Sequence, residues 1–354
     1  MRSVGLGVYF GIKENRPKYR DYISEAKVFG FSEIFMGIGF ILKEKNVDKE
    51  LKEIRDFSIY AENLGYYVFT DINPEFMKFF NASPDNLEPY LKTGVKGIRL
   101  DYGFNVEEMA KIIRNARRLN LYVELNASIF SEGDLERLSK LTDFENVKAS
   151  HDFYPPLYTG ISLEEVIRKS SPFKRFGIPV GIFVGSNREK LRNTVESLRK
   201  YSPWQAEEIL FATGKIDRVI IGDPLEDSQD LKKEGEVASR DYIKIRVIPY
   251  NISDEERKAF NHVLYSRKRE FAVSAGDYIE NKVTPRCVVR KFRGSVSIMT
   301  NRPDYIEVWI WTKDSPADPT FTIIGEVLEE DMQIVDLVED HDKILLEAIE
   351  SRFT

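Results

Sequence analysis

Short apolar runs alternate with amphipathic segments through the first two-thirds of the chain. The segment Val106–Leu119 carries apolar residues close to the 3.6-residue period of a helix, and Val47–Leu64 does so with one lapse at Ser58. Asn105 and Ser162 stand where N-caps of predicted helices belong. The apolar runs predict eight strands: Val4–Phe10, Glu33–Ile38, Tyr67–Ile72, Gly97–Asp101, Leu121–Asn126, Val147–Phe153, Pro179–Val184 and Arg218–Gly222.

The regular alternation of strand and helix indicates the fold class. Each unit takes about 30 residues, as a strand–helix–strand repeat does. Gly30, Gly65 and Gly177 follow helical segments at positions where a C-terminal cap is expected. A doubly wound sheet also alternates, but it rarely continues through eight regular units without switching. We therefore predict an α/β protein with a (β/α)₈ TIM barrel, the catalytic domain, over residues 1–239.

The pattern changes after Gly222. Residues 223–241 are polar and charged, with a predicted last barrel helix at Glu226–Glu236. From Tyr242 onward, strand-like runs are separated by Gly, Pro, Asn and Asp: IKIRVIPY, CVVRKF, SVSIMT, YIEVWIWT and FTIIGEVL. We predict a smaller β-rich domain over residues 240–354, with the single cysteine, Cys287, as a small buried side chain in one of its strands.

Composition narrows the classes of protein to consider. The chain has 354 residues, 42% of them hydrophobic, and a formal net charge of −6, which argues against a nucleic-acid partner. One cysteine allows no intrachain disulfide and fits a reducing compartment. The sequence shows neither a signal peptide pattern nor the roughly 18 consecutive apolar residues of a membrane span. We expect a cytoplasmic protein without a membrane partner.

Polar side chains follow the ends of most predicted barrel strands, where the chemistry of a (β/α)₈ barrel gathers. Any one of them can be a helix cap or a loop acceptor instead. Their accumulation predicts an active site. The candidates, in strand order, are Asp71; Arg99 and Asp101; Glu124 and Asn126; His151 and Asp152; Ser186 and Asn187; and Gly222.

Three carboxyl groups from consecutive strands form the centre of this predicted site. Neighbouring strands lie about 4.8 Å apart, so Asp71, Asp101 and Glu124 are expected to converge and to shift one another's pKa values, which suits proton transfer. Arg99 shares one side of its strand with Asp101 and either holds a carboxylate ionised or forms a structural ion pair. The three histidines lack zinc-ligand spacing, and we predict neither a metal nor a cofactor.

Several of these segments resemble a known bacterial family. LGVYF, TDINP, GIRLDYGF, ELNAS, SHDFYP and ATGKIDRVIIGD, followed by AGDYIENKVTPR and KFRGSVSI, resemble in order the 6-phospho-N-acetylmuramidases of peptidoglycan recycling. The resemblance implies a TIM barrel followed by a cyclophilin-like β-barrel. It also implies cytoplasmic hydrolysis of the β-1,4 bond of N-acetylmuramic acid 6-phosphate–N-acetylglucosamine, a small phosphorylated disaccharide.

The motif positions that carry this resemblance include most of the candidates named above. The others are Phe153, Tyr154, Thr159 and Gly160 in the barrel, and Gly276, Asp277, Arg286 and Gly294 in the second domain. The chain departs from the family's pattern in three places. Asp152 stands where the family has asparagine, Phe10-Gly11 replaces Pro-Glu, and Leu198 replaces a histidine in a shortened loop. The departures bear on which sugar is bound.

Glycoside hydrolysis needs one protonated and one ionised carboxyl group. We expect Asp101, beside Arg99, to be the ionised group and Glu124 to be the acid, with Asp71 as the third candidate. Substrate contacts are expected as follows: Asn126, His151 and Tyr154 to the sugar; Ser186, Asn187 and Gly222 to the phosphate through backbone N–H groups; Arg286 as a clamp on the phosphate; and Asp152 as an added carboxyl group that perturbs the set.

Other functions fit the same fold. A sugar-phosphate isomerase or epimerase would use a carboxylate base, usually with a metal. A sensor of phosphorylated sugars would bind without turnover, and a peptide-binding module on the second domain is a further alternative. The fold alone does not choose among these, because this barrel hosts many chemistries. The sequence also leaves a homo-oligomer open.

Overall fold

The computed structural model describes residues 2–349. Within this range the chain forms two compact units. The first comprises residues 2–210 and 214–239, and the second comprises residues 211–213 and 240–349. Each unit contains its own closed β-barrel.

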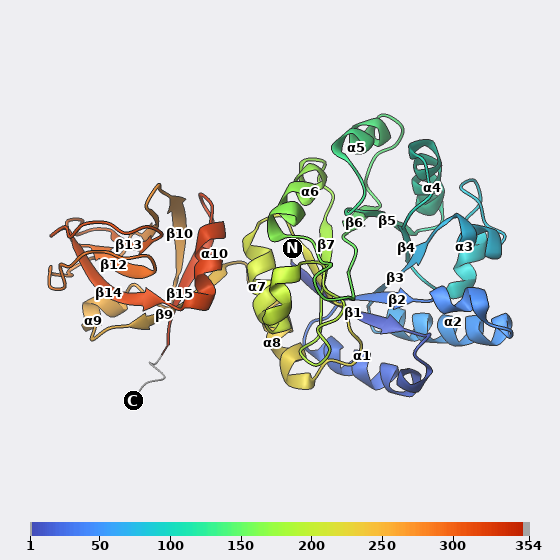
Figure 1. Cartoon of the computed structure of the whole chain (residues 1–354), viewed down its shortest axis with the longest axis horizontal. Helices are drawn as coiled ribbons and strands as arrows, with labels where there is room; N and C mark the ends of the chain where they lie inside the picture. Colours follow the sequence, from blue (N-terminus) through green and yellow to red (C-terminus); the bar gives the residue numbers. More distant parts are fainter. Residues whose placement is uncertain (1, 350–354) are drawn as a thin grey trace. The chain divides into compact units, whose positions relative to one another are not determined.

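The first unit is a barrel of eight parallel strands in sequential order, closed by pairing of the first strand with the eighth. Figure 1 shows its helices on the outside of the ring. The predicted (β/α)₈ fold is confirmed, with strand ends that differ by at most three residues. The strands are β1 (Ser3–Tyr9), β2 (Glu33–Gly37), β3 (Tyr67–Ile72), β4 (Gly97–Leu100), β5 (Tyr122–Asn126), β6 (Val147–Ser150), β7 (Val180–Val184) and β8 (Arg218–Ile221).

The helices of this unit begin and end where the sequence signals stand. Asn105 and Glu108 form a reciprocal capping box at α4, and the Ser162 side chain caps α6. Gly30, Gly65 and Gly177 have positive φ, as expected of C-terminal caps. The helices are α1 (Tyr19–Val28), α2 (Val47–Asn63), α3 (Pro74–Phe79), α4 (Val106–Arg118), α5 (Glu132–Ser139), α6 (Leu163–Arg175), α7 (Pro203–Ala212) and α8 (Ser228–Ala238), with 3₁₀ turns η1 (Lys13–Lys18), η2 (Gly39–Lys43), η3 (Glu88–Thr93) and η4 (Glu196–Lys200).

An aromatic layer fills the middle of this barrel. Phe35, Phe69 and Phe183 pack together with Ile220, and Phe153 packs on them from beyond the end of β6. The predicted strand through Phe153 ends three residues early, and the Phe153 ring contributes to this packing.

The second unit is a closed barrel of seven strands in the order β10-β11-β13-β12-β14-β9-β15. A smaller β-rich domain is confirmed, and its likeness to cyclophilin stays a prediction. Its elements are β9 (Ile243–Pro249), β10 (Val263–Lys268), β11 (Ala272–Asp277), β12 (Ser295–Met299), β13 (Ile306–Trp311), β14 (Phe321–Val327), β15 (Lys343–Ala348), α9 (Asp254–Arg257), α10 (Met332–Leu337) and η5 (Glu329–Asp331).

One predicted strand of this unit is wrong. The segment CVVRKF, residues 287–292, contains no strand; a single bridge joins Lys291 to Ser315. Val288 and Val289 are exposed, so the apolar letters that suggested a strand do not face a core. Cys287 is half-buried in this segment instead of packed within a strand. The strands β10, β11 and β15 were not predicted. Charged residues end the apolar pattern of β10 and flank that of β15, and small residues weaken that of β11.

Candidate functional site

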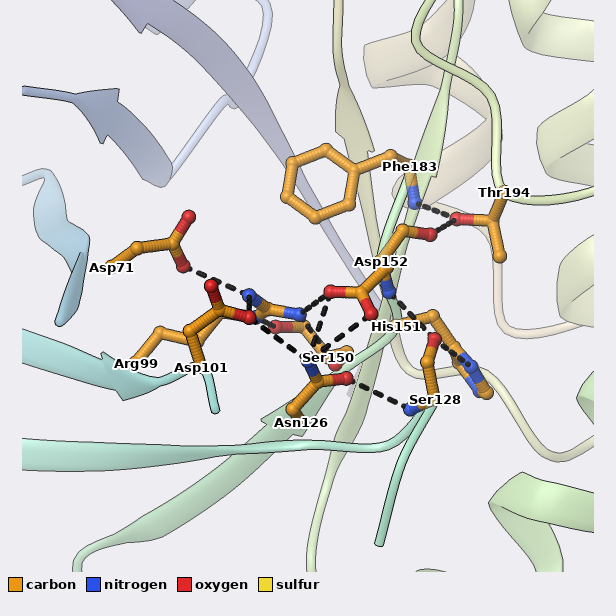
Figure 2. Close-up of polar contacts among 10 residues, drawn as sticks. All are labelled: Asp71, Arg99, Asp101, Asn126, Ser128, Ser150, His151, Asp152, Phe183 and Thr194. Carbon is orange, nitrogen blue, oxygen red and sulfur yellow. Dashed lines mark hydrogen bonds and ion pairs between the residues drawn. The ribbon is translucent and has the colours of Figure 1, made fainter. Parts of the chain in front are cut away.

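Arg99 organises the C-terminal mouth of the eight-stranded barrel. Its guanidinium donates to Asp71 Oδ1 at 2.9 Å, to Asp152 Oδ1 at 2.5 Å and to Ser150 Oγ at 2.9 Å. Asp101 Oδ1 lies farther away, 3.9 Å from Arg99 Nη1. Figure 2 shows the three carboxyl groups around this one guanidinium. Because Arg99 is only 3% exposed, its position is fixed by these contacts.

Asn126 connects two of the carboxyl groups. Its Nδ2 donates to both oxygens of Asp152, at 2.9 and 3.1 Å, and lies 3.3 Å from Asp101 Oδ1. Its Oδ1 accepts from the backbone N–H of Ser128 at 3.0 Å, which fixes the orientation of the amide. Asn126 was expected to bind the sugar directly. In the structure its amide contacts the carboxyl groups of Asp101 and Asp152.

The strand geometry explains which residues reach the mouth. Side chains at alternate positions share one side of a strand. On β4 this places Arg99 and Asp101 on one side, and on β6 it places Ser150 and Asp152 together beyond Lys148. Asp152, which departs from the family's pattern, is a central member of the site.

Two carboxyl groups at the mouth have raised pKa values. Burial raises the pKa of Asp71; Arg99 opposes this rise, and Asp101 and Asp152 add to it. Burial also raises the pKa of Asp101, with Arg99 lowering it and Asp152 raising it. Arg99 supplies one positive charge against three carboxyl groups, and the raised pKa values of Asp71 and Asp101 favour their protonated forms.

Asp71 and Asp101 line the same cavity, of about 210 Å³, at the carboxyl ends of β2, β3 and β4. The other lining residues are Gly37, Ile38, Gly39, Thr70, Ile72, Asn73 and Phe76. The cavity gives a ligand direct access to both carboxyl groups. It is smaller than the roughly 300–1,000 Å³ that encloses a drug-sized ligand.

Glu124 does not join this group, and the expected convergence of Asp71, Asp101 and Glu124 is wrong. Glu124 has no exposed surface, and its Oε1 accepts from Arg218 Nη2 at 2.7 Å. Arg218 also contacts Glu33, at 2.6 Å, and Lys148 lies 3.4 Å from Glu33. These residues come from β2, β5, β6 and β8, so their charges meet inside the barrel.

The difference between Glu124 and Asn126 is one pleat of β5. Both residues lie on the same side of the strand, but two residues correspond to about 6–7 Å along it. Asn126 therefore reaches the mouth, whereas Glu124 is held deeper by Arg218. Neither polar residue type nor the side of the strand distinguished these depths, because both residues share one side of β5.

His151 is buried away from the surface, so the structure does not support its expected contact with the sugar. It is completely buried; Nε2 lies 2.8 Å from Ser170 Oγ and Nδ1 lies 3.4 Å from Ser128 Oγ. Ser128 Oγ in turn accepts from the backbone N–H of Asp152 at 2.8 Å. Ser150 and Ser170 were not predicted to belong to the site, because a serine in a strand or a helix carries little signal by itself.

The buried imidazole makes the stability dependent on pH. Burial lowers the pKa of His151 to about 3, against about 6.5 in an unfolded chain. The unfolded state binds a proton at a higher pH than the native state, so this group's contribution to stability is lost as pH falls from about 6.5 toward 3. The loss should reach on the order of 4–5 kcal/mol at the lower limit.

We expect His151→Gln to remove most of this pH dependence, because glutamine does not titrate. The measurement is the free energy of unfolding in urea from pH 7 to pH 4, compared with the wild-type protein. The contributions of Asp71 and Asp101 have the opposite sign, but they are present in both proteins and cancel in the difference. Exposed His341, changed to Gln, is the matched control. Equal slopes in wild type and His151→Gln would contradict the buried neutral imidazole.

The expected phosphate cradle after β7 and β8 is already occupied by the protein's own acceptors. The backbone N–H of Ser186 donates to Asp223 Oδ2 at 3.0 Å, and that of Asn187 donates to Glu226 Oε2 at 2.6 Å. The N–H of Gly222 donates to the Val184 carbonyl at 2.7 Å. These three N–H groups therefore already have partners within the protein, so the expectation that Ser186, Asn187 and Gly222 offer them to a phosphate is corrected.

Two further expected substrate contacts are placed as follows. Tyr154 lies in the loop after β6, where its N–H donates to the Asn193 carbonyl at 2.9 Å; its contact with a sugar stays a prediction. In the second unit, the Arg286 guanidinium donates to both carboxylate oxygens of the buried Glu256, at 2.6 and 2.7 Å. A phosphate would have to compete with this ion pair, and the proposed clamp also stays a prediction.

Eight parallel strands with polar and charged groups gathered at their carboxyl ends define a TIM-barrel protein with a candidate active site at the mouth. The chain belongs to the 6-phospho-N-acetylmuramidase family: the model of that family's N-terminal domain matches residues 4–236. No curated protein matches the chain. Within residues 2–349, no helix is long and apolar enough to cross a membrane.

Two solved structures resemble the chain over nearly its full length. An uncharacterized protein of B. cereus is 26% identical, with a TM-score of 0.79, over 98% of this chain and 99% of that one. A conserved protein of unknown function from Enterococcus faecalis is 23% identical, with a TM-score of 0.65, over 99% and 97% of the two chains. The second likeness concerns the fold alone.

Proposed function

We propose that this protein hydrolyses the glycosidic bond of a 6-phosphorylated amino-sugar disaccharide of the N-acetylmuramic acid 6-phosphate–N-acetylglucosamine type, in cytoplasmic recycling of cell-wall sugars. The family supports glycosidase chemistry on a phosphorylated sugar. The observation that carries the proposal is the shared cavity of Asp71 and Asp101, in which two carboxyl groups are held differently by one arginine.

In this mechanism Asp101 is the proton donor. It lies 3.9 Å from Arg99 Nη1, whereas Asp71 accepts a direct hydrogen bond from the same nitrogen at 2.9 Å. The direct, charge-assisted bond stabilises the ionised form of Asp71 more than that of Asp101. This reverses the role expected for Asp101 from the sequence, because proximity to Arg99 favours its neighbour instead.

The reaction then uses the two carboxyl groups as a matched pair. Asp101 transfers its proton to the glycosidic oxygen as the bond from that oxygen to the anomeric carbon breaks. Ionised Asp71 faces the positive charge that develops on the anomeric carbon. A water molecule supplies the hydroxyl group that ends on that carbon and the proton that restores Asp101. Arg99, Asn126 and Asp152 hold both groups in place.

Product analysis tests the proposed reaction directly. The protein is incubated with the phosphorylated disaccharide and with its unphosphorylated counterpart, and the products are identified by mass. We expect free N-acetylglucosamine together with N-acetylmuramic acid 6-phosphate, and at least about 100-fold slower release without the phosphate, since a lost charged contact costs on the order of 3 kcal/mol. A product of unchanged mass would indicate an isomerase or epimerase, and binding without any product would indicate a sensor; either result contradicts the proposal.

A further inference from the structure

Tyr158, in the loop after β6, combines an exposed ring with an unfavourable backbone conformation. Its side chain is 90% exposed, and its φ is +65°, in the left-handed region that non-glycine residues rarely adopt. Such a conformation persists only where the surrounding structure imposes it, and it is frequently found at binding sites. The unfavourable backbone conformation at Tyr158 is therefore not offset by burial of its side chain.

The backbone around Tyr158 is held by the ion pair of half-buried Glu196 with buried Arg199. Glu196 accepts from the N–H groups of Tyr158 and Gly160, each at 2.8 Å, and from Arg199 Nε at 3.0 Å. Any side chain at Gly160 would lie only 2.8 Å from the Glu196 backbone nitrogen, so the close approach requires glycine.

Arg199 extends this clamp to both adjoining loops. It is 7% exposed, and its guanidinium donates to the carbonyl oxygens of Tyr154 and Pro156 on one side and of Lys190 and Leu191 on the other. The loops after β6 and β7 are thereby joined into one rigid support. A rigid support is what an exposed binding ring requires, because little entropy is then lost on binding.

The cavity that contains the carboxyl groups is too small for a whole disaccharide. At about 210 Å³ it lies below the range that encloses a drug-sized ligand, so part of the substrate must lie outside it. Tyr158 belongs to the loop after β6 that also contains Asp152, at the carboxyl end of that strand. A tyrosine ring offers a flat apolar face on which the C–H groups of a pyranose pack.

We propose that Tyr158 is the platform for the second sugar ring of the substrate, the leaving group of the reaction, and that the Glu196–Arg199 clamp presents it. This inference rests on the proposed glycosidase function. It assigns selection of the leaving group to an aromatic contact on the loop after β6, outside the cavity.

The test compares two phosphorylated substrates that share the cleaved ring. One is the disaccharide, and the other carries a methyl group in place of the second sugar. Tyr158→Ala should lower kcat/KM for the disaccharide about 10-fold and leave the methyl glycoside unchanged, on the scale of one aromatic contact. Tyr158→Phe keeps the ring and should retain at least about half of the wild-type value, since a change below twofold is under 0.5 kcal/mol.

The outcomes separate this inference from the proposed function. Equal losses on both substrates, or no loss on the disaccharide, would overturn the platform while leaving the glycosidase intact. If the wild-type protein cleaves neither substrate, the proposed function fails, and the dissociation constant of the disaccharide, measured by calorimetry for wild type and Tyr158→Ala, decides the platform alone. An unchanged constant would then reject it.

Discussion

Replacement of Asp101 by asparagine should lower kcat on the phosphorylated disaccharide about 10³-fold, within the range typical of a lost general acid. Asparagine has nearly the same shape, keeps a hydrogen-bonding group next to Asn126 and cannot donate a proton of comparable acidity. The KM should change by less than about threefold, because the substitution leaves the cavity intact. Steady-state kinetics on purified protein provide the measurement.

A substrate with a different leaving group tests whether Asp101 acts as the acid. A nitrophenyl leaving group needs little protonation, so Asp101→Asn should retain most of its activity on a nitrophenyl glycoside of the phosphorylated sugar. Asp71→Asn should lose activity on both substrates, since the positive charge on the anomeric carbon develops in either case. The opposite pattern would exchange the roles of Asp71 and Asp101, and full activity of Asp101→Asn on the disaccharide would remove it from the mechanism.

A surface aspartate provides the matched control. Asp143 is paired with Arg117, and both side chains are exposed. Asp143→Asn makes the same chemical change as Asp101→Asn at a site outside the mouth, so its kcat should remain at the wild-type value.

The pH–rate profile provides a second test of the acid role of Asp101. Activity should decline as pH rises through the raised pKa of Asp101, because the donor form is then lost.

The barrel was predictable because its information is local and repeated. Eight apolar runs, each followed by an amphipathic segment with caps such as Asn105 and Ser162, leave few alternatives to a closed parallel barrel. The second domain was less predictable. Polar and charged residues interrupt the apolar pattern in β10, and small residues weaken it in β11, so periodicity alone missed three strands and assigned one to CVVRKF that is absent.

The residue types of the site were predictable from the sequence, but the depth of each side chain in the barrel was not. The sequence indicated that Asp71, Arg99, Asp101, Asn126 and Asp152 end strands at one face, and the structure brings these residues together. The sequence did not indicate which charged side chains would form ion pairs with one another. The long side chains of Arg99 and Arg218 decide this: one reaches three groups at the mouth, and the other holds Glu124 in the interior.

This division of charges predicts a large effect on stability at Glu124. Glu124→Gln removes one of two carboxylates that face Arg218 and Lys148 in the barrel interior, and leaves an excess positive charge without water. Breaking a buried ion pair by removal of one partner costs about 3–5 kcal/mol. We expect the free energy of unfolding, measured in urea, to fall by about that amount.

The same variant should keep its catalytic rate. At a temperature where Glu124→Gln is fully folded, kcat on the phosphorylated disaccharide should stay within about threefold of wild type, since Glu124 touches no part of the cavity. Glu132→Gln, which removes an exposed partner of Arg175, is the matched control and should cost less than about 1 kcal/mol. A variant of native stability whose kcat is reduced a thousandfold would instead make Glu124 the acid and return Asp101 to the ionised role.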